Sequence, residues 1–236
     1  MHKKKLNLLS MDYTSAEEIS AHEDADNVPL CDNFDGSVTV CHNGKIIHCL
    51  TIIGQIEGHY NLPSNNKTTK YEHIIPRIIA VDQNDEIDGL LLLLNTVGGD
   101  IEAGLAIAEL VSGMSKPTVS LVLGGSHSIG IPLAVSATRA FIVPTASMTV
   151  HPVRMNGLVI GVPQSMIYLN KMEQRVLDFI ERHSKITKKR FKELMTNNNE
   201  LVTDFGTVLS GEESVEEGII DQIGDLSDAF SYFDNI

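Results

Sequence analysis

The sequence is short of positive charge and of long apolar runs. It carries 18 Lys and Arg residues against 31 Asp and Glu residues, so its net charge is −13 with histidine neutral. A nucleic-acid partner is not expected, because such binding depends on Lys and Arg side chains that neutralise phosphates. No apolar run reaches the roughly 18–20 residues of a membrane-spanning helix, and the apolar stretch after Lys3–Lys5 stops at Leu9, too early for a secretory signal. We expect a soluble, cytoplasmic, acidic globular protein with no transmembrane segment.

Cysteine is also scarce, and its placement does not favour a metal site. Cys31, Cys41 and Cys49 are odd in number, lie near the N-terminus and form no C-x-x-C pair. With His42 and His48 they could be combined into a ligand set, but structural zinc sites use paired ligands at short spacings. We predict neither a metal nor a cofactor.

What is present suffices for a large domain preceded by an acidic segment. The chain has 236 residues, of which 42% are hydrophobic, enough for a sizeable core. Residues 15–36 include seven acidic residues and no Lys or Arg, and such a segment buries too little apolar surface to offset its ordering entropy. We therefore predict a disordered acidic tail over residues 1–45 and one folded domain over 46–236. An acidic docking arm for a partner is the alternative interpretation of the same charge.

Apolar runs and helical periodicity alternate after residue 44. Continuous apolar runs such as Leu90–Leu94 are typical of strands buried on both faces. The expected strands are 45–53, 90–94, 118–123, 140–143 and 148–150, and the expected helices are 71–81, 100–110, 126–137, 164–183 and 187–195. This alternation predicts an α/β fold with a mostly parallel sheet.

Two glycine-rich turns join an expected strand to an expected helix, and neither suits a nucleotide. Gly99–Gly104 has the G-x-x-x-x-G spacing of a phosphate loop, but Leu105 and Ala106 stand where Lys and then Ser or Thr are required. The alternative is that these turns present backbone N–H groups at helix N-termini. Such groups can stabilise a developing oxyanion, because the donors are in place before the charge forms.

The second turn, Gly125–Gly130, also places a serine at the start of a helix. Ser128 partly matches the tight turn that exposes a nucleophilic serine, although Ser126 occupies the earlier glycine position of G-x-S-x-G; a helix-capping serine is the other interpretation. A nucleophilic serine needs a base. His151 is the best placed histidine, because it ends a short strand, and catalytic groups gather at strand carboxyl ends in open α/β sheets. A hydrogen-bonded structural histidine remains the alternative.

Several segments, in the same order along the chain, resemble the proteolytic subunit of Clp protease, ClpP. The matching segments are Asn95–Ile107 at the sheet-to-helix turn, Ser128–Gly130 at the nucleophile turn, Met148–Pro152 at the histidine motif, and Leu209–Ser214 with Gly218–Asp221 near the end. Further segments are similar to a translocation-enhancing, ClpP-like branch of that family: Gly54–His59, Lys67–His73, Gly124–Gly130 and His151–Arg154. The resemblance covers roughly residues 50 to 225. It implies a ClpP/crotonase-like α/β fold with a mostly parallel sheet, surrounding helices and a handle-like helical extension.

Residue by residue, the resemblance implies roles for four positions in the two turns and the histidine motif. Ser128 would be the nucleophile and His151 the general base. Gly99 and Ile129 would supply the two backbone N–H groups of the oxyanion hole.

The third member of the triad is assigned to Asp204. The family's aspartate precedes the segment that matches Leu209, and gap-free counting falls on Gly206, so the nearest carboxylate is chosen. It would fix the tautomer of the histidine and stabilise the imidazolium. Val97 replaces the proline usual in the first turn, a change that bears on the peptide-binding strand rather than on the oxyanion hole.

The implied activity is that of a serine endopeptidase acting on peptides or unfolded proteins, within a homo-oligomeric ring. The family's ATPase partner is not carried over, because this chain begins with an acidic extension instead of a short axial loop. Two rivals remain open. One is a non-hydrolytic, crotonase-like acyl-CoA enzyme, although the sequence lacks an obvious basic site for the CoA phosphates; the other is a catalytically silent ring scaffold that aids protein translocation.

Overall fold

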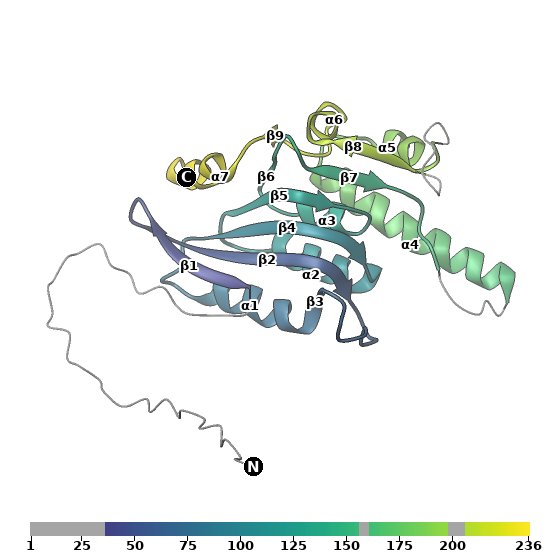
Figure 1. The fold of residues 1–236 in the computed structure, drawn as a ribbon, viewed down its shortest axis with the longest axis horizontal. Coiled ribbons are helices and arrows are strands. Elements are labelled where there is room, and N and C mark those ends of the chain that lie inside the picture. The colour runs from purple at the N-terminus through teal and green to yellow at the C-terminus, as the bar shows by residue number, and fades with distance from the viewer. Residues whose placement is uncertain (1–35, 156–160, 198–205) are drawn as a thin grey trace, which may run out of the picture.

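The computed structural model of the chain describes residues 36–155, 161–197 and 206–236. Strands and helices alternate along most of it (Figure 1). The strands are β1 (Ser37–His42), β2 (Lys45–Glu57), β3 (Thr68–Lys70), β4 (Gly89–Gly99), β5 (Thr118–Ser126), β6 (Arg139–Ile142), β7 (Ser147–Val150), β8 (Thr207–Ser210) and β9 (Gln222–Ile223). The helices are α1 (Tyr71–Gln83), α2 (Ile101–Ser112), α3 (Gly130–Val135), α4 (Val162–His183), α5 (Lys188–Met195), α6 (Gly211–Glu216) and α7 (Leu226–Asp234).

The sheet is mostly parallel and has the order β1-β2-β4-β5-β6-β9. Parallel pairing joins β2 to β4, β4 to β5, β5 to β6 and β6 to β9, whereas β1 is antiparallel to β2. A smaller antiparallel pair, β7 with β8, is attached to the end of β5. The predicted α/β fold with a mostly parallel sheet is confirmed.

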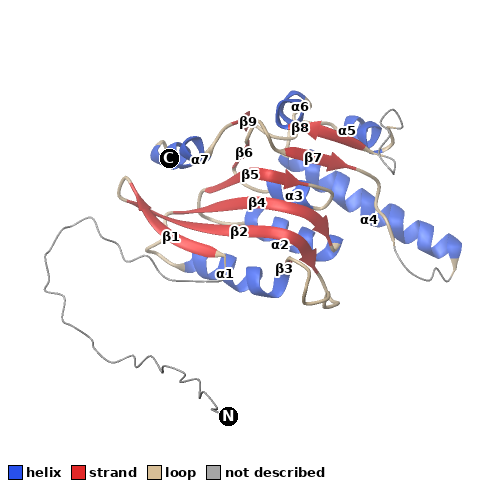
Figure 2. Cartoon of the chain, in the orientation of Figure 1, coloured by secondary structure: helices blue, strands red, loops and turns tan. Residues whose placement is uncertain are grey.

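Two apolar clusters hold the layers together. On one face, residues such as Leu92, Leu94 and Val122 pack under α1, α2 and α3, and the carboxyl half of α4 joins the same cluster. On the other face, Leu91 and Leu121 belong to a smaller cluster with Phe233 of α7. Figure 2 shows these helices around the red strands, with α4 extending beyond the sheet. No helix among the described residues is long and apolar enough to cross a membrane.

Several element boundaries differ from the prediction because pairing between strands carries them into the glycine-rich turns. β4 continues to Gly99 rather than ending at Leu94, since Gly98 and Gly99 still pair with β2. α3 is shorter than the predicted helix 126–137, because β5 extends to Ser126. Asp100 and Thr187 are the N-caps of α2 and α5, and their side chains accept hydrogen bonds from backbone N–H groups of these helices.

β1 lies inside the range 1–45 that was assigned to the acidic tail. Its residues alternate Val38 and Val40 with polar positions, and the strand pairs with Lys45–Leu50 of β2. The short strand has little apolar content of its own, so its order depends on that partner strand. The folded region therefore begins at least eight residues earlier than the predicted boundary of 45, and residues 1–35 lie outside the described part.

Candidate active site

The nucleophile turn is held by backbone hydrogen bonds on both sides. Ser128 has φ of 56°, in the left-handed region that a residue with a Cβ rarely adopts. Its N–H donates to the Thr149 carbonyl of β7 at 2.9 Å, and the His127 N–H donates to the Thr96 carbonyl of β4 at 3.1 Å. Strain of this kind costs about 1–3 kcal/mol and persists only where neighbours impose it. The neighbouring strands therefore impose a sharp conformation on the turn that carries Ser128, of the kind in which a tight turn exposes a serine.

The first glycine turn packs directly against the nucleophile turn. Gly98 has φ of 87°, and a Cβ placed on it would lie 2.8 Å from the Ser128 Cβ and 3.4 Å from the Ile129 nitrogen. Gly99 has φ of 152°, and a Cβ there would collide with the Ile56 carbonyl of β2. Both positions thus require glycine, for backbone conformation and for space. The close approach places the Gly98 backbone against Ser128 and the Ile129 nitrogen.

His151 follows β7 directly and is partly buried. Its Nδ1 lies 2.7 Å from the Pro152 carbonyl oxygen. A carbonyl can only accept a hydrogen bond, so Nδ1 carries the proton, which leaves Nε2 of the neutral ring as an acceptor. This tautomer, assigned from the contact, is the one that a general base of the Ser-His type uses.

One cavity of about 210 Å³ joins these residues. Ser128, His151, Gly99 and Ile129 all line it. The remaining wall includes Arg154 and apolar side chains from four helices. The helical ones are Ile101 of α2, Ile131 of α3, Val176 of α4, and Phe191 and Met195 of α5. The structure therefore brings together four of the five predicted site residues.

Asp204, the fifth, lies outside the described residues, and Gly206, two positions after it, lies beside His151. The Gly206 N–H donates to the Asn197 carbonyl at 3.2 Å. A Cβ on Gly206 would lie 3.0 Å from the His151 Cβ, and its φ is 145°, so position 206 has no room for a side chain. Two residues of chain span at most about 7 Å.

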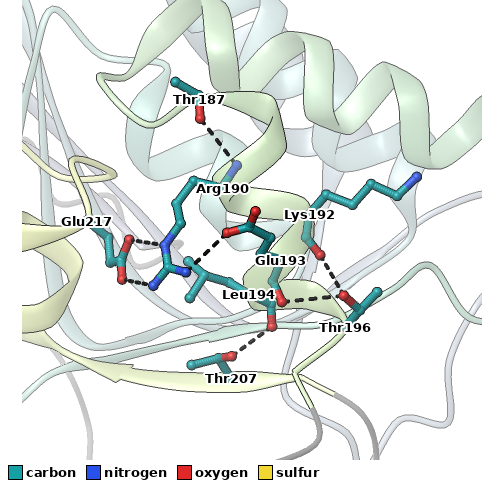
Figure 3. A network of polar contacts seen from close by, with 8 residues as sticks. All are labelled: Thr187, Arg190, Lys192, Glu193, Leu194, Thr196, Thr207 and Glu217. Carbon is teal, nitrogen blue, oxygen red and sulfur yellow. Dashed lines mark hydrogen bonds and ion pairs between the residues drawn. The ribbon is translucent and has the colours of Figure 1, made fainter.

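Figure 3 shows the polar contacts of α5 with Thr207 of β8 and with Glu217. The Thr207 hydroxyl donates to the Leu194 carbonyl at 2.7 Å. Arg190 makes a two-pronged contact with Glu217, at 2.9 Å from Nε to Oε2 and 2.6 Å from Nη2 to Oε1. These hydrogen bonds from Arg190 hold the pKa of Glu217 below its ordinary value. The Thr207 hydroxyl therefore joins β8 to the backbone of α5, and the Arg190 side chain joins α5 to the end of α6.

His127 directly precedes Ser128, and no role was predicted for it. Its Nδ1 is buried and has no hydrogen-bond partner among the described residues. Burial, and after it the nearby His151, hold the pKa of His127 below its ordinary value. The ring is therefore neutral at pH 7. In the sequence, only its position immediately before Ser128 could have identified His127. Arg154 could have been identified from the His151–Arg154 motif.

Comparison with known proteins agrees with the resemblance seen in the motifs. A sequence model of the Clp protease family matches residues 44–227. The translocation-enhancing protein TepA of Halalkalibacterium halodurans is 60% identical over 183 residues, which is 78% of this chain and 72% of that protein. The ATP-dependent Clp protease proteolytic subunit of Lactococcus lactis subsp. cremoris is 25% identical over 159 residues, or 64% of this chain and 74% of that subunit. Subunit 1 from Protochlamydia amoebophila is 25% identical over 153 residues, with 64% and 72% covered. The chain belongs to the Clp protease family.

Proposed function

We propose that this chain is a serine endopeptidase that hydrolyses peptide bonds in peptides or unfolded proteins. One observation carries the proposal: Ser128, His151, Gly99 and Ile129, which come from three separate strand ends, line the same cavity. The Clp protease family and the similarity to proteolytic subunits support it.

In the proposed reaction, the Ser128 hydroxyl attacks the peptide carbonyl carbon and its proton passes to Nε2 of His151. The Pro152 carbonyl on Nδ1 keeps Nε2 free of a proton beforehand. The negative oxygen is stabilised by the N–H groups of Gly99 and Ile129. His151 then protonates the departing amine, and water releases the acyl group from Ser128 by the same sequence in reverse. Asp204 is the proposed partner of the imidazolium.

The cavity wall suggests which side chain the substrate places there. Ile101, Val176, Phe191 and Met195 offer an apolar surface, with Arg154 at the same cavity. Burying an apolar side chain against such a wall is favourable by about 1.5–3 kcal/mol. We therefore expect cleavage after apolar residues.

The proposed assembly is a homo-oligomeric ring. The first half of α4 exposes apolar side chains although the helix ends in the core. The exposed set is Val162, Met166, Ile167 and Tyr168. Exposed apolar groups in this number on one half-helix indicate contact with another surface, and this half of α4 is the handle-like extension expected from the sequence. The ATPase dependence in the names of the proteolytic subunits is a property of those proteins and is not proposed here.

The test is hydrolysis of an unfolded protein and of short fluorogenic peptides by the purified full chain. Ser128→Ala should lower the rate by at least about 10³-fold while leaving the circular dichroism spectrum unchanged. Ser227→Ala, an exposed serine in α7 far from the cavity, is the control and should keep full activity. Equal rates for the Ser128→Ala and wild-type proteins would overturn the proposal.

A further inference from the structure

A second cavity, which shares no lining residue with the first, lies at the edge of the sheet beside β3 and α1. We call it the basic groove; it has a volume of about 530 Å³ and is lined by Lys67, Lys70, His73 and Arg77 together with Thr51 and Ile53. No acidic side chain is among the described residues that line it. In a chain with net charge −13, this hollow is lined by three Lys and Arg residues.

The groove is a defined shape rather than a gap between mobile side chains. The Thr69 hydroxyl donates to the Ile53 carbonyl at 2.9 Å and accepts from the Ile53 N–H at 2.9 Å, which locks β3 against β2. Lys70 lies 3.6 Å from Glu57, whose side chain is buried. A hydrogen bond from Thr68, before other contacts, holds the pKa of Glu57 below its ordinary value. Ile53 adds an apolar surface that is 48% exposed.

The described chain begins at the groove. The Gly36 carbonyl accepts hydrogen bonds from the Thr51 N–H at 2.9 Å and from the Thr51 hydroxyl at 2.7 Å, and Thr51 lines the groove. Gly36 itself has φ of 88°. The residues before Gly36 therefore start within hydrogen-bond distance of the groove wall.

Those residues have the complementary chemistry. Residues 15–35 carry seven acidic side chains and no Lys or Arg, and the nearest of them to Gly36 are Asp35 and Asp32. Four residues of chain reach about 14 Å, so both carboxylates can reach the groove from Gly36. In the sequence, Phe34 lies between these two aspartates and Leu30 precedes them. Either apolar side chain could cover Ile53.

We propose that the acidic segment over residues 24–35 binds the basic groove of the same chain. Opposite charges bring the two together, and a short tether makes the contact intramolecular at high effective concentration. The proposal gives the N-terminal segment a fixed place on the edge of the sheet, distinct from the cavity that holds Ser128. It does not depend on whether the chain hydrolyses peptides.

Carbodiimide cross-linking of the full chain tests the proposal, because this reagent joins a carboxylate to an amine only when the two are in contact. Peptide mass spectrometry should find Asp32 or Asp35 joined to Lys67 or Lys70. An equal mixture of ¹⁵N-labelled and unlabelled chains should yield these cross-links within one isotope only. Raised salt should lower their yield, since exposed charge pairs are screened.

Arg77→Gln provides a second, independent check, because arginine does not react with the reagent. Loss of its charge should lower the cross-linking yield at Lys67 about fivefold. Lys189→Gln, which removes one exposed positive charge on α5, is the matched control and should leave the yield unchanged. The proposal is overturned if Lys67 and Lys70 form no cross-link to residues 24–35, if the cross-links join different isotopes, or if Arg77→Gln has no effect.

Discussion

The two sides of the candidate active site are built in different ways. On the nucleophile side, Ser128, Gly99 and Ile129 are placed by backbone hydrogen bonds and by glycines at the ends of β4 and β5. On the histidine side, His151 follows a small β7–β8 pair, and the neighbouring α5 and β8 are joined by side-chain contacts such as Thr207 to Leu194. Changes on the first side should therefore act through steric strain, and changes on the second through lost orientation.

The largest effect after the two central residues is expected at Asp204. Asp204→Asn should lower kcat by about 10³–10⁴-fold, because the imidazolium of His151 loses the carboxylate proposed to stabilise its charge. Glu200→Gln removes a charge from the same loop and is the matched control. Peptide hydrolysis by both variants gives the comparison. Equal rates for Asp204→Asn and the wild type would mean that the Pro152 carbonyl alone orients His151, and the histidine side would be simpler than proposed.

Gly99→Ala should have the next largest effect, through the backbone. The added Cβ collides with the Ile56 carbonyl, so the Gly99 N–H must move away from the oxyanion. Loss of one such donor lowers kcat about 10²–10³-fold. Gly44→Ala is the control, since Gly44 also has positive φ (81°) but faces open space. It should cost about 1 kcal/mol of stability without loss of activity; equal activity losses in the two variants would contradict the steric explanation.

Local sequence patterns were sufficient for β2, β4, β5, β6 and β7 and for the serine turn, and insufficient for the strand boundaries and for the other strands. The apolar run Leu90–Leu94 predicts a buried strand, but its continuation to Gly99 depends on pairing with β2. β1 was missed for the same reason: Val38 and Val40 become a strand only against β2. In each case the deciding partner lies on another segment of the chain, and a window of local sequence does not contain it.

In the candidate site too, contiguous motifs were predictable and contacts between distant segments were not. Ser128, His151 and the glycines of the first turn could be proposed as site residues because their motifs are contiguous. Phe191 and Met195 reach the cavity from a helix about 40 residues beyond His151, and nothing in their spacing indicates this. The Pro152 carbonyl on Nδ1 of His151 and the buried ring of His127 depend on packing, so neither could be derived from residue order.

Thr207→Val tests the side-chain contacts of the histidine side. The buried Leu194 carbonyl loses the hydroxyl that donates to it. This loss should lower the free energy of unfolding by about 1–3 kcal/mol. Urea denaturation measures this cost. Thr196→Val is the matched control, because the Thr196 hydroxyl contacts the Lys192 carbonyl in an exposed position, and it should cost less. The same loss for both would show that the Thr207 contact does not hold β8.

The smallest expected effect is at Glu217, where the contact is partly exposed. Glu217→Gln should lower the free energy of unfolding by at most about 1 kcal/mol at pH 7. Since the pKa of Glu217 is lowered in the folded state, its contribution is present above the ordinary value of 4.5 and is lost as the pH falls below it. Denaturation of both proteins from pH 7 to pH 3 should show the difference vanish at the acid end. A difference that grows toward low pH would contradict this sign, and Glu216→Gln is the neighbouring control.

The most direct test of the serine peptidase proposal is labelling by a fluorophosphonate, which reacts with a serine only when that serine is activated. Mass spectrometry of the full chain should find one label, on Ser128, and His151→Gln should slow its formation by at least about 10³-fold. A folded chain whose Ser128 remains unlabelled, or is labelled equally fast without His151, would contradict the account and favour a ring protein without peptidase activity.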